Sequence, residues 1–273
     1  VMLVETPSNN TSATIAMRGG VTINPAITWE PTVGVYLDGV YLGKTQGAIF
    51  DVVDLERVEI LRGPQGTLYG RNTLGGAINL ISQRPNGSGV ETKLTLGNYG
   101  LTQAQFTTDF EIADGTYGKL VVNSKERDGY VHNAPGPYGG AQGVVPSADP
   151  TVNELDTINS HGFRFTIARD TDNSSFDLSV DYNDQSNTPP FAQLGYTIPN
   201  WSAAFGVGAS PATGGLKLWP IELYTSKGRA KVAHVNEAVF EKSEVSGVAL
   251  TYSRDTNLGT VKAILARRET EWS

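Results

Sequence analysis

The sequence contains no cysteine, which excludes disulfide frameworks, cysteine-ligated zinc, iron–sulfur clusters and cysteine nucleophiles. Charged residues make up only 18%, against roughly 25% in an average soluble domain. Acidic residues outnumber basic ones, 28 to 21, for a net charge of −7, and this balance argues against a nucleic-acid partner. No apolar run of about 18 residues occurs, and no signal peptide follows Val1.

Glycine, in contrast, is frequent, with 31 among 273 residues, whereas an average domain contains about 7%. The length allows one large or two modest domains with a sizeable core. The composition is too apolar for a disordered chain and has no collagen period. The first residues, Val1 to Thr6, read as an interrupted strand, so we expect the chain to be a piece of a longer protein.

The pattern changes near Arg84–Gly87. Before this point, short apolar runs are separated by glycine and are rich in β-branched and aromatic residues. Such runs predict buried strands of a small mixed domain, with one short helix over Leu68–Asn72. The predicted strands are Thr14–Met17, Gly34–Leu42, Arg57–Leu61 and Ala77–Ser82.

After Pro85 the chain alternates between apolar and polar residues. Phe176, Leu178 and Val180, for example, are interleaved with Asp177 and Ser179, which places an apolar stripe on one strand face and a polar stripe on the other. The same alternation occurs at 90–96, 103–112, 117–127, 163–167, 245–253 and 260–272. About seven strands are predicted, each near the 9–11 residues that a tilted strand needs to cross a bilayer.

The connections between these strands differ in length. Asp114-Gly115, Asp170–Ser174 and Asp255–Gly259 are turn-like, whereas the segments near 129–159 and 184–242 are long and rich in glycine and proline. Alternating short turns and long loops are typical of an outer-membrane barrel. A soluble β-sandwich would alternate as well. The second face is rich in Gln, Thr, Ser, Asn and Asp, which favours a wet lumen but leaves the sandwich open.

A chain of motifs covers residues 34–81. It reads GVYLDGVYLG from Gly34, DLERVEILRGPQGTLYGRN from Asp54 and GGAINLI from Gly75, and an Arg18-Gly19 step stands upstream. In order and spacing these motifs resemble the plug domain of TonB-dependent outer-membrane receptors. The residues that carry the resemblance are Arg18, Gly19, Asp38, Gly39, Arg57, Glu59, Arg62, Gly63, Pro64, Gly66, Tyr69, Gly70, Gly75 and Gly76.

Within this motif, Arg57, Glu59 and Arg62 form a charged string beside Val58 and Ile60. Taken alone, the string is typical of a solvated strand face. The family resemblance favours charged contacts between the plug and the barrel wall, which are strong only when the charges are matched.

The resemblance implies an α+β plug domain over residues 1–85 and antiparallel transmembrane strands over 86–273. These strands would belong to an incomplete, all-β barrel of the type with roughly 22 strands. It also implies active transport across the bacterial outer membrane. The implied partners are TonB with an ExbB–ExbD type inner-membrane complex, the outer-membrane lipid and a small-molecule cargo, with no nucleic acid. An iron–siderophore complex is the leading cargo; haem, cobalamin, nickel chelates and oligosaccharides stay open.

Ligand contacts are expected from aromatic residues of the long loops, since aromatic side chains suit a bulky or ring-bearing solute. Anchoring at the membrane interface or packing within the loops is an equal alternative for each of them. The candidates are Tyr130, Tyr138, Phe191, Tyr196, Trp201 and Trp219.

The sequence offers little support for phosphate binding, metal binding or catalysis. Gly63–Asn72 lacks the Gly-Lys-Ser/Thr ending of a phosphate-binding loop, and Asp170–Ser174 lacks the glycine and the glutamate of a calcium loop. His132, His161 and His234 are scattered without metal-ligand spacing. With no nucleophile motif, no enzyme, cofactor or resident metal is predicted. The alternative function is a non-transporting binding or adhesion module of the cell envelope, built as a β-sandwich.

Overall fold

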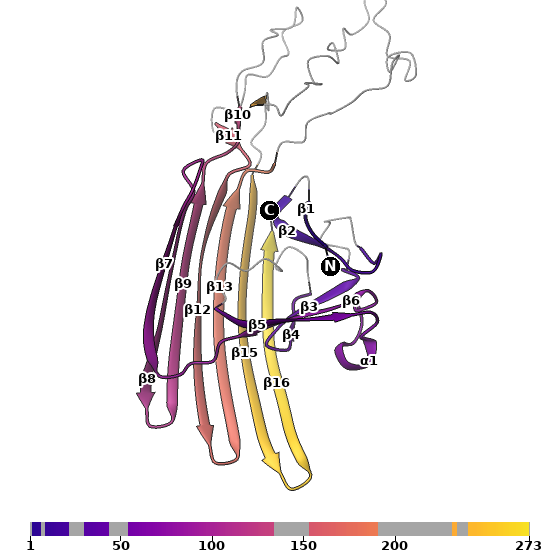
Figure 1. The fold of residues 1–273 in the computed structure, drawn as a ribbon, viewed down its shortest axis with the longest axis vertical. Helices are drawn as coiled ribbons and strands as arrows, with labels where there is room; N and C mark the ends of the chain where they lie inside the picture. Colours follow the sequence, from indigo (N-terminus) through magenta and orange to yellow (C-terminus); the bar gives the residue numbers. More distant parts are fainter. Residues whose placement is uncertain are drawn as a thin grey trace, which may run out of the picture.

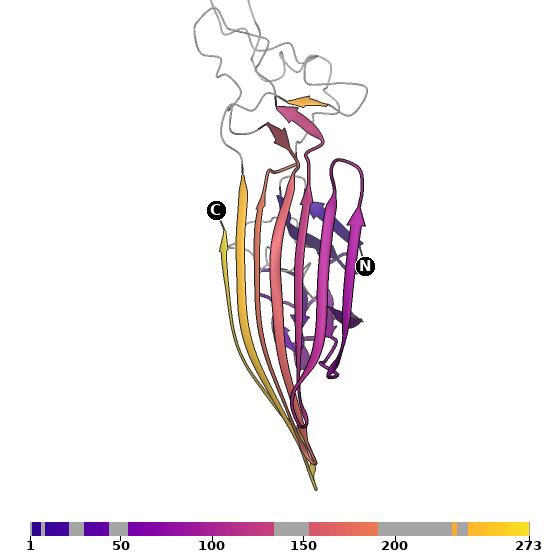
Figure 2. The ribbon, with the colours of Figure 1, turned by 90° about the vertical axis from the view of Figure 1, so that its left-hand side faces the viewer.

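The structure is a computed structural model and describes residues 2–6, 9–21, 30–43, 54–133, 153–190, 231–233 and 240–272. It has two parts. A tall sheet of long strands forms a wall, and a small domain, here called the plug, lies crosswise against one face of that wall (Figure 1). A view turned by 90° places the plug behind the same sheet, so the two views agree (Figure 2).

The plug is built on a four-stranded sheet with the order β4-β3-β6-β5. A buried cluster of Val35, Leu37 and Leu42, against which Ile15 and Leu80 pack, forms the core of the plug. The β1–β2 hairpin is separate from this sheet. The elements are β1 (Met2–Thr6), β2 (Asn9–Ala16), β3 (Val33–Leu37), β4 (Val40–Tyr41), β5 (Leu55–Arg62), α1 (Gly66–Tyr69) and β6 (Gly76–Ser82).

The wall contains seven strands in the order β16-β15-β13-β12-β9-β8-β7, and all neighbours are antiparallel. Strands that follow one another in sequence are neighbours in space, which is the up-and-down arrangement that the alternation predicted. Their bounds are β7 (Ser88–Leu96), β8 (Thr102–Ala113), β9 (Thr116–Arg127), β12 (Ile158–Thr171), β13 (Ser174–Asn187), β15 (Glu241–Thr256) and β16 (Gly259–Trp272).

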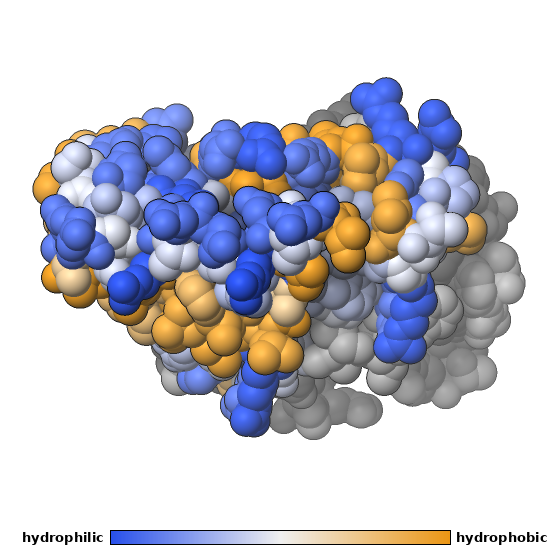
Figure 3. Space-filling view, turned by 90° about the horizontal axis from the view of Figure 1, so that it is seen from below, coloured by the Kyte–Doolittle hydropathy of each residue, from blue (hydrophilic) through white to orange (hydrophobic). Residues whose placement is uncertain are grey.

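The two ends of the wall differ. At one end, two-residue turns close the hairpins, for example Asp114-Gly115 between β8 and β9. At the other end a small sheet, β11-β10-β14, lies above the strands (Figure 1). It consists of Glu154–Leu155, Val131–Asn133 and Val232–Ala233. These short strands fall inside the segments that the sequence predicted as long loops. Figure 3 views the turn end, where hydrophilic residues of the turns stand beside hydrophobic residues of the strands.

The burial of the wall is inverted relative to a soluble protein. On β13, Leu178 and Val180 are 40% and 39% exposed, whereas Ser179 and Asp181 between them are 7% and 4% exposed. The polar stripe is thus buried on the side of the plug, and the apolar stripe is open. Large apolar side chains are likewise exposed along the other wall strands, including Val90, Leu94, Phe106, Phe163, Val248 and Leu265. Such a wall is suited to hydrocarbon on its outer face, so the sandwich alternative is wrong.

Two local predictions in the plug need correction. Gly34–Leu42 is a hairpin instead of one strand, because Asp38 and Gly39 adopt positive φ and reverse the chain between β3 and β4. The helix lies at Gly66–Tyr69, two residues earlier than predicted. It ends there because Gly70, with φ of 81°, leaves the helical conformation.

Candidate functional site

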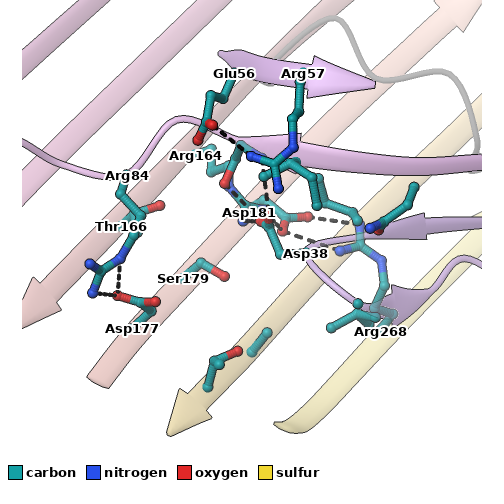
Figure 4. Close-up of a pocket in the computed structure, with 18 of the residues that line it drawn as sticks. Asp38, Glu56, Arg57, Arg84, Arg164, Thr166, Asp177, Ser179, Asp181 and Arg268 are labelled. Atoms are coloured by element: carbon teal, nitrogen blue, oxygen red, sulfur yellow. Dashed lines mark hydrogen bonds and ion pairs between the residues drawn. The ribbon is translucent and has the colours of Figure 1, made fainter. Parts of the chain in front are cut away.

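The interface between the plug and the wall encloses a polar site. A cavity of about 500 Å³ lies there, between the β3–β4 turn, β5 and β6 of the plug and strands β12, β13, β15 and β16 of the wall. Five basic and four acidic side chains line it. Figure 4 shows that these side chains converge from both parts of the protein.

The plug reaches the wall through its β3–β4 turn. Asp38 and Gly39 have φ of 52° and 87°, the left-handed conformation that Asp tolerates and Gly prefers. An added Cβ on Gly39 would lie 2.9 Å from Cδ1 of Ile264, so a larger residue would force the end of that side chain to shift. The Asp38 carboxylate accepts hydrogen bonds from the backbone N–H of Ser82 at 2.8 Å and from its hydroxyl at 2.8 Å.

Across the interface, Arg164 Nη2 donates to Asp38 Oδ2 at 2.6 Å. Arg164 Nη1 also donates to Asp181 Oδ1 at 3.0 Å. Arg268 Nη2 then donates to the other oxygen of Asp181 at 2.8 Å. The side chains of Arg164 and Asp181 are 6% and 5% exposed, and those of Arg268 and Asp38 at the two ends of the row are 15% and 28% exposed. The centre of the row is therefore buried, and Figure 4 shows the four side chains together. A buried charge of this kind is tolerated only when it is matched.

Register explains how the row forms. Arg164 faces Asp181, Asp181 faces Gly247, and Gly247 faces Arg268 on the next strand. Gly247 leaves room for Arg268 to reach across β15, because an added Cβ there would lie 2.6 Å from Arg268 Nη1 and 3.0 Å from Asp181 Oδ2. Because Gly247 has no side chain, charged residues from three strands, β12, β13 and β16, meet in one row.

Two further ion-pair groups join the segments before the first wall strand to the wall. Arg84 donates to Asp177 at 2.6 Å and to Asp170 at 3.0 Å, near the turn between β12 and β13. Burial lowers the pKa of Arg84, but the hydrogen bonds to both aspartates outweigh it and raise the pKa above its ordinary value. Lys119, buried on β9, donates to Asp54 at 2.7 Å and lies 3.5 Å from Asp109.

The glycine-rich motif organises the plug itself. Arg18 and Gly19 form a tight turn closed by paired backbone hydrogen bonds between Met17 and Gly20. Gly76 has no room for a side chain, since an added Cβ would lie 2.2 Å from Met17 Sδ. The Tyr69 carbonyl accepts a hydrogen bond from the Tyr36 hydroxyl at 2.6 Å. Gly66 begins α1, and Gly63, Pro64, Gly70 and Gly75 belong to the connections on either side of that helix.

The charged string forms pairs within the plug. Arg57 donates to Glu56 at 2.6 Å and to Glu59 at 2.9 Å, and these side chains are largely exposed. A hydrogen bond from Asn79, followed by that from Arg57, lowers the pKa of Glu59. The hydrogen bonds to both glutamates raise the pKa of Arg57. Arg62 is exposed and makes no ion pair within the described part of the chain. A wall contact of these three residues stays a prediction.

The tyrosines of α1 and of the β3–β4 hairpin form an aromatic group. Tyr36 packs against Tyr41 and Tyr69, with ring centroids 5.3 and 4.9 Å apart. Desolvation, followed by the two neighbouring phenols, raises the pKa of Tyr36, so its hydroxyl stays a proton donor. Desolvation also raises the pKa of Tyr41, although a hydrogen bond from Asn72 opposes it.

Of the predicted ligand aromatics, the structure describes Tyr130. Its ring packs edge-on against Tyr99 with centroids 4.5 Å apart, and the guanidinium of Arg127 lies 4.1 Å from its centroid. This group stands near the small β11-β10-β14 sheet, at the end of the wall opposite the turns. Tyr138, Phe191, Tyr196, Trp201 and Trp219 lie outside the described residues.

The alternating pattern does not single out the wall charges at the interface. Arg164 lies within the alternating segment 163–167, Arg84 lies where the pattern changes, and no motif marks Asp181, Lys119 or Arg268. A usable signal existed: a charged residue in mid-strand between two outward apolar residues, such as Arg164 between Phe163 and Phe165, must point into the interior of the barrel. Which charges then meet depends on register, which one strand alone does not reveal.

No helix within the described ranges has the length and apolar character needed to cross a membrane. Among those same residues, no group of three or more histidines and carboxylates could hold a metal ion.

Comparison with known proteins agrees with this architecture. The family model of the TonB-dependent Receptor Plug Domain matches residues 2–77. The pesticin receptor of Yersinia enterocolitica is 33% identical over 138 residues, which are 48% of this chain and 19% of that protein. The catecholate siderophore receptor Fiu of Escherichia coli is 32% identical over 127 residues, 45% of this chain and 15% of that protein.

Solved structures share the fold over nearly the whole chain. The ferric yersiniabactin uptake receptor FyuA from Yersinia pestis superposes with a TM-score of 0.68 at 21% identity, covering 97% of this chain and 35% of that one. The pyoverdine receptor FpvA from Pseudomonas aeruginosa gives a TM-score of 0.63 at 14% identity, covering 99% and 33%.

The fold therefore defines a class: a plug domain seated against the wall of an outer-membrane β-barrel. Within that class, residues 2–77 match the TonB-dependent Receptor Plug Domain, and the chain as a whole is similar to TonB-dependent outer-membrane receptors, with the plug first and barrel strands after it. The chain spans about a fifth of the length of the curated relatives that it matches first.

Proposed function

We propose that the receptor carrying this chain takes up a ferric siderophore across the bacterial outer membrane, using energy delivered by TonB. One observation carries the proposal: the polar face of the wall is buried beneath the plug, while its apolar face is open. A polar bore closed by a separate domain is a sealed path for a hydrophilic solute, and opening it requires work on the plug.

In this proposal residues 1–85 are the plug and 86–273 supply the first seven strands of the barrel. TonB, energised by an ExbB–ExbD type complex, would pull on the plug from the periplasmic side, where the short turns lie. Solute would bind at the opposite end. Tyr130 stands at that end, and we extend the same role to Tyr138, Phe191, Tyr196, Trp201 and Trp219. The receptor would act by binding and transport, without catalysis.

The cargo class follows from the relatives. The matched proteins include a catecholate siderophore receptor, a ferric yersiniabactin uptake receptor and a pyoverdine receptor. We therefore propose that the cargo is an iron–siderophore complex. Ferric yersiniabactin, a ferric catecholate and ferric pyoverdine are the three compounds for the test.

The test is uptake of these three complexes, labelled with radioactive iron, by cells whose own siderophore receptors have been deleted. Cells that express the receptor carrying this chain should accumulate iron from at least one complex. A matched strain without TonB should bind the complex at its surface and accumulate none. Accumulation that is equal with and without TonB would overturn the proposal, as would no accumulation from any of the three.

A further inference from the structure

The buried row at the interface is neutral only because the plug contributes to it. Arg164, Asp181 and Arg268 belong to the wall, and Asp38 belongs to the plug. The wall alone thus presents two guanidinium groups to one carboxylate. If Asp38 were withdrawn, the wall would retain one uncompensated positive charge beside the cavity, and an anion could neutralise it.

The Arg164 guanidinium is also incompletely satisfied. Its Nη1 donates to Asp181 and its Nη2 to Asp38, but its Nε is buried without a hydrogen-bond partner among the described residues. The side chain is 6% exposed. Nε and Nη2 form one edge of the guanidinium, and a carboxylate can bind such an edge with two parallel hydrogen bonds. Asp38 uses only one of these two donors.

Asp38 is held more firmly by the plug than by the wall. Its backbone N–H donates to the Leu80 carbonyl at 2.9 Å, and its carboxylate accepts two hydrogen bonds from Ser82. Among the described residues, its hydrogen bond to the wall is the single contact with Arg164. A movement of the plug would therefore carry Asp38 with β6 and leave Arg164 behind. The adjoining cavity of about 500 Å³ gives an incoming group room to approach.

We propose that Arg164, flanked by Asp181 and Arg268, is a carboxylate-binding site in the bore, which Asp38 of the plug occupies while the plug is seated. When the plug moves, the site becomes available to an anionic group of the passing solute. This role in passage rests on the proposed function, whereas the site itself does not depend on transport.

The experiment is chemical rescue with acetate, which reproduces the carboxylate of Asp38. In the purified full receptor, Asp38→Gly removes that carboxylate, and glycine suits the positive φ at this position. We expect a lower melting temperature for this variant. Sodium acetate should restore at least half of the loss in a saturable manner, whereas the neutral isostere acetamide, at the same ionic strength, should restore none.

Three controls make the result specific. Asp38→Asn keeps the volume of the side chain and should not respond to acetate. Asp54→Asn removes a plug carboxylate whose partner, Lys119, retains Asp109, so it should not respond either. Arg164→Gln added to Asp38→Gly should abolish the rescue. If Asp38→Gly does not assemble, Asp38→Ser leaves a similar void and is measured in the same way.

Equal responses to acetate in the wild type, the Asp38→Gly variant and the Asp54→Asn variant would overturn the proposal, as would rescue that survives Arg164→Gln. These measurements need neither TonB nor a siderophore. A receptor that shows acetate rescue but takes up no siderophore would contradict the proposed function alone, and the reverse result would contradict the carboxylate site alone.

Discussion

At the scale of the residue, the interface between the plug and the wall depends on two glycines, whose lack of a side chain leaves room for neighbouring groups. Gly247 makes room for Arg268 to pair with Asp181, and Gly39 allows the plug turn to approach Ile264. At both positions a Cβ atom would come within 3 Å of a neighbouring side chain. The charged partners have little exposure to water, so their energy depends on matched geometry.

Gly247→Val should displace Arg268 from Asp181, because even a Cβ would come within 2.6 Å of Arg268 Nη1. We expect a loss of about 1.5–3 kcal/mol in the free energy of unfolding, the value of a hydrogen bond to a charged group. Urea unfolding of the receptor in lipid vesicles measures it. On an Arg268→Gln background the same substitution should cost much less; equal costs on both backgrounds would show that the valine acts elsewhere.

At the scale of the element, each wall strand separates two environments. Along β13 (Ser174–Asn187) residues alternate between a buried polar face and a more exposed face, and the exposed face is apolar at Phe176, Leu178 and Val180. The alternation was visible in the sequence, and the fold class that it predicted is confirmed. The sequence did not reveal that the strand continues beyond its apolar stripe to Asn187, because polar residues there fit a loop as well as a strand.

Leu178→Arg places a charge on the open apolar face of β13. Near the middle of the bilayer this should cost about 2–4 kcal/mol, so less receptor should fold into vesicles or reach the outer membrane. Folding is measured by the shift in electrophoretic mobility of unheated samples. Ser186→Arg, also exposed but at the far end of the strand, is the control and should fold normally. Normal assembly of Leu178→Arg would contradict the assignment of this face to lipid.

At the scale of the whole molecule, three ion-pair groups hold the plug and the segment after it to the wall. They are Asp38 with Arg164, Asp54 with Lys119, and Arg84 with Asp170 and Asp177. These groups share no residue, so the effects of breaking them should add approximately.

Combining Asp38→Asn, Asp54→Asn and Arg84→Gln should loosen the plug and raise passive leak. Cells with this receptor should become several-fold more sensitive to vancomycin, which is too large to cross an intact outer membrane, and each single variant should have a smaller effect. Expression in the outer membrane must be equal among the strains. Unchanged sensitivity of the triple variant would contradict a sealing role for these pairs.

Arg62 carries a separate expectation. It makes no ion pair within the described part of the chain, yet its motif resembles that of plugs that contact the barrel wall. We expect Arg62→Ala in the receptor to loosen the plug and raise the same leak. Arg71→Ala, which breaks a pair with Glu30 within the plug, is the comparison; if Arg62→Ala leaves vancomycin sensitivity unchanged, the predicted wall contact is wrong.

The sequence by itself determined the class of the protein and its two kinds of structure. Short glycine-separated runs specify a compact plug, and period-two alternation specifies strands that separate a polar side from an apolar side, because both patterns are local. The tertiary structure alone decided which charges meet. Asp38 and Arg164 are 126 residues apart, and their contact depends on the register of three strands and on the seating of the plug, which are properties of the packed molecule.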